Sequence, residues 1–282
     1  MRAPVLMAVH AHPDDESSQT GGTLARYAAA GYRTVLVTCT DGGQGDAAGG
    51  LKAGQPGHDP HQVATERSRE LDLAAAALGV HAVVKLGYPD SGVSDGGERG
   101  AAAESFSLRP VRPMVARLVR LMQLYRPEVL VTYPPNGFSG HPDHIRTHDL
   151  VVAAHRHLIA NGEVEAESSP APRLYYIALS KSRLRGARDR ARAALGADAW
   201  VPPDEMAIDD AQVTTVIDVA AFWPDKLRAM AAHASQSDAA ALLQMFSAAD
   251  ESAGRVEEYV RAYPAPAGGS VVVEDDFFNN GR

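Results

Sequence analysis

Residues 5–16 read VLMAVHAHPDDE, and this stretch decides the class of fold. It opens with an apolar run of strand length and passes directly into a proline-containing loop. A second apolar run, TVLVTCT at residues 34–40, is rich in β-branched side chains and is typical of another strand. Between them, residues 22–30 carry apolar side chains at helical spacing, which predicts a helix with Ser17 and Ser18 near its N-cap.

The same alternation of strand and helix patterns continues along the chain. Further helices are predicted over 62–78, 111–125 and 145–159, and further strands over 83–86, 129–133 and 174–179. This order predicts an α/β fold with a Rossmann-like, mostly parallel sheet and helices on both faces. We expect a single domain over 1–282, with a core at about 4–180 and a smaller C-terminal extension at about 181–282. Within that extension, 222–232 is a predicted helix and 271–273 is strand-like.

Composition narrows the class of protein. Of the 282 residues, 45% are hydrophobic and 22% are charged, which is ordinary for a globular domain. No apolar run reaches the roughly 20 residues that span a bilayer, and no signal-peptide pattern is present, so we expect a cytoplasmic protein without a membrane partner. The net charge of −8 argues against nucleic acid as a partner. The single cysteine, Cys39, excludes an intrachain disulfide and is expected to be buried.

Two short clusters carry the chemistry. HPDDE at residues 12–16 follows the first predicted strand, and HPDH at residues 141–144 follows the fourth. In an open parallel sheet, ligands bind beyond the carboxyl ends of the strands. Histidine and carboxylate are zinc ligands, and a catalytic zinc uses three of them plus water. An acidic, helix-capping loop is the simpler alternative for the first cluster, but it leaves the second cluster unexplained.

The two clusters together resemble the LmbE/PIG-L-like zinc deacetylases. This family includes enzymes that deacetylate N-acetylglucosaminyl-inositol and enzymes that cleave mycothiol conjugates. The likeness covers most of residues 4–240. Weaker matches lie at Thr38–Thr40, Arg67, Asp90–Gly92, Lys226 and His233–Gln236.

The resemblance implies a metal site and a base. His12, Asp15 and His144 would be the zinc ligands, and Asp14 would be the general base. The chemistry agrees, because zinc lowers the pKa of a bound water to about 7 and polarises a carbonyl, and a nearby carboxylate can accept the proton. Fe²⁺ is a possible alternative metal, because a site of two histidines and one carboxylate does not choose strongly between them.

The resemblance also implies roles around the substrate. His141 would stabilise the oxyanion or protonate the leaving amine, with Asp143 orienting it. Arg67 and Asp90 match positions that grip sugar hydroxyls, and an Arg donor with an Asp acceptor suits a polyol. The expected partner is therefore a small-molecule amide, such as N-acetylglucosaminyl-inositol or a mycothiol conjugate. A homo-oligomer is possible.

Two positions depart from the family pattern. Ser139 stands where the mycothiol-pathway deacetylase has a tyrosine, and Gln19 stands where the conjugate amidase has a lysine. These differences leave deacetylase and conjugate amidase both open, and they admit a tailoring enzyme of a secondary metabolite.

Two other functions fit the sequence less well. GQGDAA at residues 43–48 matches a dinucleotide fingerprint, which would indicate an NAD-dependent oxidoreductase. However, it follows the second strand and leads into another Gly/Pro loop, whereas the fingerprint needs a helix to receive the pyrophosphate. A non-enzymatic carbohydrate-binding module would need sugar contacts but would have no use for a metal with a base beside it.

Overall fold

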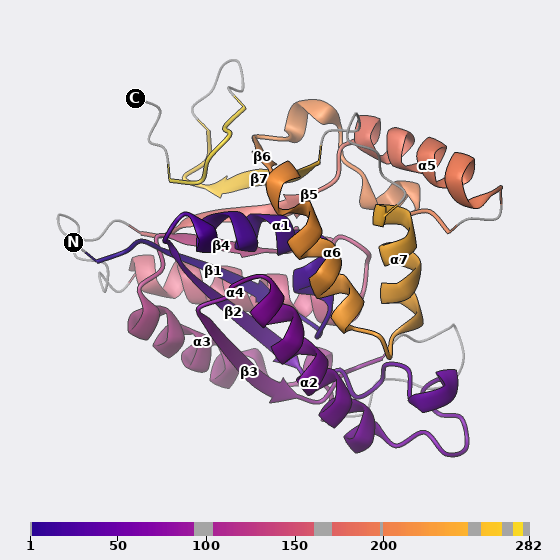
Figure 1. Cartoon of the computed structure of the whole chain (residues 1–282). Coiled ribbons are helices and arrows are strands. Elements are labelled where there is room, and N and C mark those ends of the chain that lie inside the picture. The colour runs from indigo at the N-terminus through magenta and orange to yellow at the C-terminus, as the bar shows by residue number, and fades with distance from the viewer. Residues whose placement is uncertain are drawn as a thin grey trace.

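The computed structural model describes residues 2–92, 104–160, 171–197, 200–247, 255–266 and 273–278. A seven-stranded sheet with the strand order β3-β2-β1-β4-β5-β7-β6 forms its centre (Figure 1). The strands are β1 (Val5–His10), β2 (Arg33–Thr40), β3 (Ala82–Tyr88), β4 (Val129–Thr132), β5 (Arg173–Ala178), β6 (Thr215–Asp218) and β7 (Val256–Tyr263). The pairings among β1 to β5 are parallel, and β7 runs antiparallel to both β5 and β6. The mostly parallel α/β sheet is therefore confirmed.

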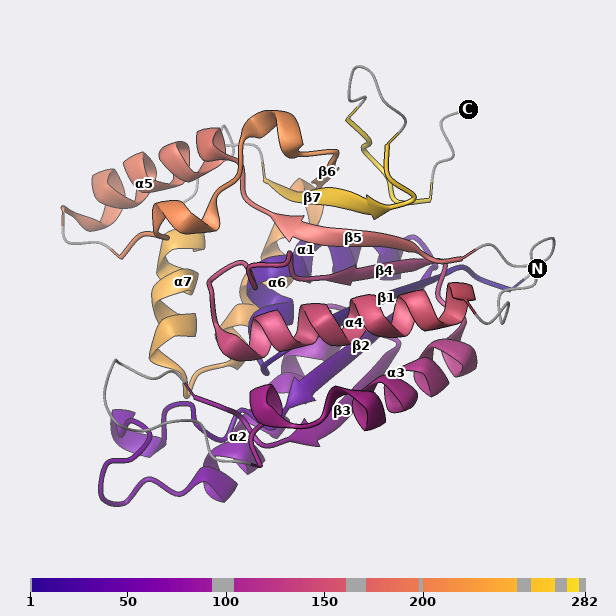
Figure 2. The ribbon, with the colours of Figure 1, turned by 180° about the vertical axis from the view of Figure 1, so that it is seen from behind.

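Helices cover both faces of the sheet. They are α1 (Asp15–Ala29), α2 (Pro60–Ala77), α3 (Val111–Tyr125), α4 (Pro142–Ala160), α5 (Lys181–Leu195), α6 (Trp223–Ala232) and α7 (Ser237–Ser247). Buried side chains of α1, α2 and α6 form the core on one face, and those of α3 and α4 form it on the other. Figure 2 shows the second face, with α5 and α7 beyond the carboxyl ends of the parallel strands. Among the described helices, none has the length and apolar character needed to cross a bilayer.

Helix α1 begins earlier than its sequence pattern predicts. The carbonyl of Asp14 accepts hydrogen bonds from the amides of Ser17 and Ser18, at 3.1 and 3.2 Å. These serines therefore lie in the first turn, and the prediction that they cap the helix is wrong. The apolar spacing fails to show this turn because its polar side chains are buried against other polar groups. Further along α1, a Cβ on Gly22 would lie 2.6 Å from Cβ of Val219, so the C-terminal extension packs closely on this helix.

The C-terminal extension supplies two strands of the sheet. The helix predicted at 222–232 is confirmed as α6, but the sequence pattern does not reveal β6 or β7. In β7 the inward-facing residues include Glu257, which is buried and breaks the apolar alternation expected of a strand. The strand-like run at 271–273 lies outside the described residues except for Val273. The division into a core and an extension within one domain stays a prediction.

Candidate active site

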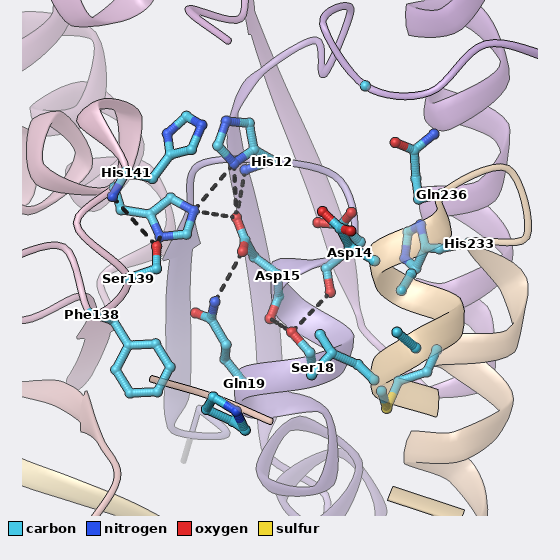
Figure 3. A pocket seen from close by; sticks show the side chains of 18 of the residues that line it. His12, Asp14, Asp15, Ser18, Gln19, Phe138, Ser139, His141, His233 and Gln236 are labelled. Atoms are coloured by element: carbon cyan, nitrogen blue, oxygen red, sulfur yellow. Dashed lines mark hydrogen bonds and ion pairs between the residues drawn. The ribbon is translucent and has the colours of Figure 1, made fainter. Parts of the chain in front are cut away.

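The two His/Asp clusters meet at one edge of the sheet. Strands β1 and β4 are parallel neighbours, and one cluster follows each of them. The first cluster turns into α1, and the second opens α4. As a result, the rings of His12 and His141 lie edge to face with centroids 4.6 Å apart, close to Asp15 (Figure 3). These residues and His144 line one cavity.

The three predicted ligands already stand at metal-binding separations. Nδ1 of His12 lies 3.2 Å from Nε2 of His144. Oδ2 of Asp15 lies 3.3 Å from the first nitrogen and 3.4 Å from the second. Donor atoms bound tetrahedrally at zinc distances are about 3.3 Å apart, so this triangle fits the ion. Two other groups of side chains could also hold a metal, namely His12 with His141 and His144, and His12 with Asp90 and Asp143.

Each histidine of the triangle is held through its other nitrogen. Nε2 of His12 lies 3.3 Å from Oδ2 of Asp143. Nδ1 of His144 lies 3.1 Å from both the carbonyl of Gly137 and the hydroxyl of Ser139. Contacts of this kind fix the ring orientation of metal-binding histidines. Ser139 is thus placed to orient His144.

The electrostatics of His12 reflect its acidic surroundings. Burial acts to lower the pKa of His12, but the carboxylates of Asp90, Asp143 and Asp15 outweigh it and raise the pKa well above the usual value. The same neighbourhood holds the pKa of Asp15 well below its usual range: burial opposes this, and His144 and His12 prevail. Three carboxylates around one imidazole form an environment in which a bound cation would be stabilised.

Tyr133, directly after β4, contacts two of the three residues of the triangle. Its hydroxyl donates to Oδ2 of Asp15 at 2.7 Å and accepts from the amide of Ala11 at 2.9 Å. Its ring stacks on His144 with centroids 4.2 Å apart. Tyr133 is fully buried and is absent from the site that the sequence predicts. Its position at the carboxyl end of a strand is the signal that could have indicated it.

Asp14 occupies a strained position beside the triangle. Its φ of 122° is rare for a residue with a side chain, and such strain persists only where surrounding contacts impose it. Arg67 supplies those contacts, because its guanidinium donates to the carbonyl of Pro13 at 2.6 Å and to Oδ2 of Asp14 at 2.8 Å. Burial raises the pKa of Asp14 to about 6, although Arg67 opposes the shift. A carboxyl with a pKa near neutrality suits a general base.

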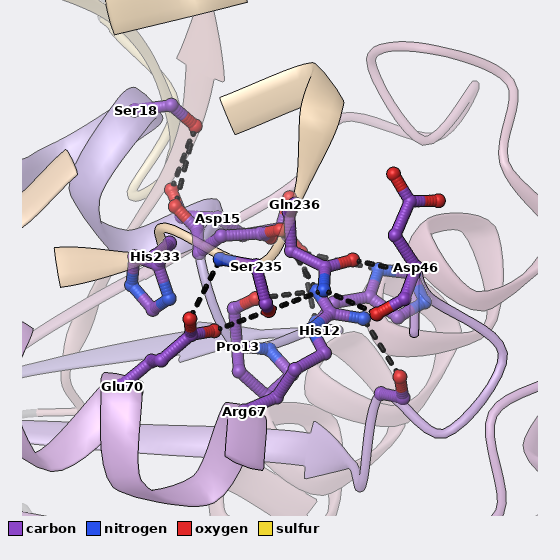
Figure 4. A network of polar contacts seen from close by, with 12 residues as sticks. His12, Pro13, Asp15, Ser18, Asp46, Arg67, Glu70, His233, Ser235 and Gln236 are labelled. Atoms are coloured by element: carbon purple, nitrogen blue, oxygen red, sulfur yellow. Dashed lines mark hydrogen bonds and ion pairs between the residues drawn. The ribbon is translucent and has the colours of Figure 1, made fainter. Parts of the chain in front are cut away.

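A polar network from the C-terminal extension supports the segment 12–16, which holds the first cluster (Figure 4). Nε2 of His233 lies 2.7 Å from Oε1 of Glu16, and Oε2 of Glu16 accepts from the amide of Asp14 at 3.0 Å. Ser235 donates to Glu70 of α2 through its amide and its hydroxyl, each at 2.8 Å. The segment 233–236, a weak sequence match, therefore braces both α1 and α2.

Of the remaining predicted residues, His141 and Asp90 line the cavity, whereas Asp143 is fully buried. Nδ1 of His141 accepts the backbone amide of Asp143 at 3.1 Å, which leaves the proton of this imidazole on Nε2. Burial, with His12 and His144 nearby, lowers the pKa of His141 to about 3. The carboxylate of Asp143 contacts His12 and Ser91, so Asp143 reaches His141 through its backbone. Asp90 accepts from the amide of Gly92 at 2.9 Å.

The segment 43–48 lacks the context of a dinucleotide site. Only a short 3₁₀ turn, Ala48–Gly50, follows it, and α2 begins ten residues later at Pro60. The helix N-terminus that the fingerprint requires is therefore missing at this point of the described chain.

Comparison with known proteins places the chain among deacetylases. Residues 7–155 match the family described as "PIG-L: GlcNAc-PI de-N-acetylase". A 1D-myo-inositol 2-acetamido-2-deoxy-alpha-D-glucopyranoside deacetylase of Rhodococcus erythropolis (strain PR4) is 36% identical over 241 residues, covering 82% of this chain and 80% of that protein. A second deacetylase of the same description, from Actinosynnema mirum, is 38% identical over 239 residues, covering 83% of this chain and 81% of that protein.

Solved structures share the fold. The N,N'-diacetylchitobiose deacetylase from Pyrococcus horikoshii has a TM-score of 0.60 at 18% identity, covering 92% of this chain and 84% of that one. A 4-carboxy-2-hydroxymuconate hydratase from Pseudomonas putida KT2440 has a TM-score of 0.61 at 18% identity, covering 94% and 99%. A deacetylase and a hydratase thus have the same architecture, so these likenesses concern the fold alone.

Proposed function

The chain belongs to the PIG-L family of de-N-acetylases, and from this premise we propose that it removes the N-acetyl group of N-acetylglucosaminyl-inositol or a related amino sugar, with zinc as its metal. It is a hydrolase of linear amides. The observation that carries the proposal is the triangle of donor atoms on His12, Asp15 and His144, with sides of 3.2, 3.3 and 3.4 Å. The proposal includes action on a small metabolite in the cytoplasm.

Each residue of the site has a separate role in the proposed reaction. His12, Asp15 and His144 would hold the ion, and zinc, when bound, polarises the amide carbonyl and makes water more acidic. Asp14 accepts the proton of the attacking water and returns a proton to the leaving nitrogen as the C–N bond breaks. His141 donates its Nε2 proton in a hydrogen bond to the oxygen that becomes negatively charged. The products are acetate and the free amine.

The sugar contacts fall on the β2–β3 side of the metal site. Asp90 follows β3 and lines the cavity with a carboxylate that can accept hydroxyl hydrogen bonds. Arg67 lines the same side, but its guanidinium also holds the carbonyl of Gly42 at 2.8 Å, besides Pro13 and Asp14. We infer that Arg67 acts on the substrate mainly by fixing Asp14, whereas Asp90 binds the sugar.

Release of the free amine tests the proposal. Purified protein is supplied with N-acetylglucosaminyl-inositol, N-acetylglucosamine, diacetylchitobiose or a mycothiol conjugate, in the presence of zinc or of a chelator. We expect chelator-sensitive release from the inositol conjugate. Asp14→Asn should retain zinc and lose about 10²- to 10⁴-fold in turnover, whereas Asp72→Asn, at an exposed carboxylate of α2, should not. Unchanged turnover in Asp14→Asn, or chelator-resistant hydrolysis, contradicts the proposal.

A further inference from the structure

The cavity that contains the metal triangle extends far beyond it. Its volume is about 1380 Å³, larger than the roughly 300–1,000 Å³ typical of small-molecule sites. The proposed contacts to the amide and to the sugar use only the part near the metal triangle. We call the part lined by Arg183 and Arg190 of α5 and by Trp223 of α6 the far wall. Helix α5 lies beyond the carboxyl ends of the parallel strands (Figure 2).

Helix α5 turns a basic face towards the cavity. Arg183, Ala187 and Arg190 line the cavity at helical spacing, which places them on one side of the helix. The two guanidiniums are close enough to affect each other. Burial lowers the pKa of Arg183, and the charge of Arg190 lowers it further, although Glu258 opposes the shift. Like charges on one wall of a cavity favour an anionic occupant.

The two arginines of the far wall differ in what they contact. Arg183 lies 3.8 Å from Glu258 and donates to the carbonyl of Val256 at 3.2 Å. Arg190 has no hydrogen bond or ion pair with any residue that the structure describes, and its Nε is buried. A buried N–H without an acceptor is unfavourable, and a ligand that brings an oxygen acceptor removes that cost.

Trp223 supplies a second donor of the same kind. It is 4% exposed, and its indole Nε1 has no partner within the described ranges of the chain. Cζ of Arg255 lies 5.7 Å from the centre of the indole ring. Arg255 directly precedes β7, whose first residue, Val256, holds Arg183. The start of β7 thus connects Trp223 to the basic face of α5.

The two glutamates beside the far wall are already engaged by other cations. Oε1 of Glu257 lies 2.5 Å from Nζ of Lys226, and Glu258 pairs with Arg183. Arg190 therefore contributes one positive charge that no carboxylate of the described residues balances. A single unbalanced charge suits a monoanion, and a carboxylate matches the planar guanidinium better than other monoanions do.

We propose that Arg190 and the indole N–H of Trp223 bind a carboxylate of the substrate, so that the substrate of this chain is an acidic glycoside of an N-acetyl amino sugar. The proposal rests on the proposed function, because the amide must lie at the metal triangle. The carboxylate belongs to the group linked through the glycosidic oxygen, since an acetyl group has no further atom to carry it. Arg190 is thus a residue that determines specificity and takes no part in the bond cleavage.

Matched pairs of ligands test this site. The probes are N-acetylglucosaminides whose glycosidic oxygen carries a chain of two, five or eight methylenes ending in a carboxylate, each compared with its methyl ester. Binding is measured by calorimetry on the zinc-loaded Asp14→Asn variant, in which hydrolysis is slow. Because charge-assisted hydrogen bonds are the stronger ones, we expect at least one acid to bind about tenfold tighter than its own ester. Equal affinity of acid and ester at all three lengths overturns the proposal.

Variants in the same background locate the carboxylate. Arg190→Gln should reduce the preference for the acid to about twofold or less, and Trp223→Phe, which removes only the indole N–H, should lower it about threefold. Arg185→Gln removes the same charge from an exposed position of α5 that does not line the cavity, and it should retain the preference. A preference that survives Arg190→Gln contradicts the site and would show that the carboxylate binds elsewhere, such as on the zinc.

Hydrolysis of the same probes by the parent protein separates this inference from the proposed function. The preferred acid should have a KM about tenfold below that of its ester at a similar kcat, because a contact far from the amide is equally strong in the ground state and the transition state. If the proposed function fails, neither acid nor ester releases its amine, even where the acid binds more tightly. If only the carboxylate site fails, acid and ester are hydrolysed with the same KM.

Discussion

The carboxyl edge of β1 and β4 and the C-terminal extension contribute differently to the same cavity. The edge supplies every proposed ligand and acid–base group, and polar side chains within 3.5 Å of one another fill it. The extension supplies none of them. It lines the cavity with apolar side chains, chiefly of α6 and α7, and with charged side chains that include Arg183, Arg190 and Lys226. The comparison indicates that the edge carries the proposed chemistry, whereas the extension forms a large part of the cavity wall.

The two regions are nevertheless joined through α1. Glu257 of β7 accepts from the amides of Gly22 and Thr23, at 3.0 and 2.8 Å. Lys226 of α6 donates to the carbonyl of Ser18 at 2.7 Å. Because α1 begins with Asp15, the extension anchors the helix that carries one proposed ligand. Variants in each region can therefore test whether the metal site depends on the contacts between the C-terminal extension and α1.

The largest effect is expected at the carboxyl edge. His144→Ala removes one nitrogen of the donor triangle, so the protein should lose bound zinc and all measurable turnover. Metal analysis of the purified variant measures this. His157→Ala, an exposed histidine further along α4, is the matched control and should bind zinc normally. Full zinc occupancy in His144→Ala would show that another group, such as His12 with Asp90 and Asp143, holds the ion.

The second largest effect is expected in the C-terminal extension, as a decrease in the free energy of unfolding. Lys226 and Glu257 are 1% and 6% exposed, so Lys226→Met leaves a buried carboxylate without its partner. We expect a loss of about 3 to 5 kcal/mol in the free energy of unfolding, measured by urea denaturation. The double variant with Glu257→Gln should recover only part of it, because both charges are then absent but the new amide NH2 faces the backbone amide of Gly22 or Thr23.

Arg228→Met provides the surface comparison for that experiment. Arg228 lies on the same helix and pairs with Asp225 at the surface, where an ion pair contributes about 0 to 1 kcal/mol. If Lys226→Met costs no more than Arg228→Met, then the extension does not anchor α1 through this pair, and the two regions are less coupled than the contacts indicate.

The sequence predicts some features of the molecule and not others, according to whether they depend on local patterns or on long-range packing. The helix 111–125 is found with its predicted bounds, and the strands of the parallel sheet are found within two residues, because apolar periodicity governs both. The triangle was recognisable because its residues lie in two short, proline-containing clusters. The residues that support the triangle were not recognisable, because their contacts join distant parts of the sequence. Tyr133 contacts Asp15, which is 118 residues away in the sequence, and His233 contacts Glu16, which is 217 residues away. Such contacts depend on how the elements pack, which periodicity does not encode.

The smallest effect should come from the support within the carboxyl edge itself. Tyr133→Phe keeps the ring that stacks on His144 but removes the hydroxyl that orients Asp15. We expect zinc affinity to fall about 10- to 100-fold, measured by competition between the metal-free protein and a chromophoric chelator. Tyr175→Phe is the matched control, because that buried tyrosine of β5 donates to Glu274 and should leave zinc affinity unchanged. Equal zinc affinity in Tyr133→Phe and the parent protein would mean that Asp15 is held by the amide of His12 and by Gln19 alone, at 2.8 and 2.9 Å.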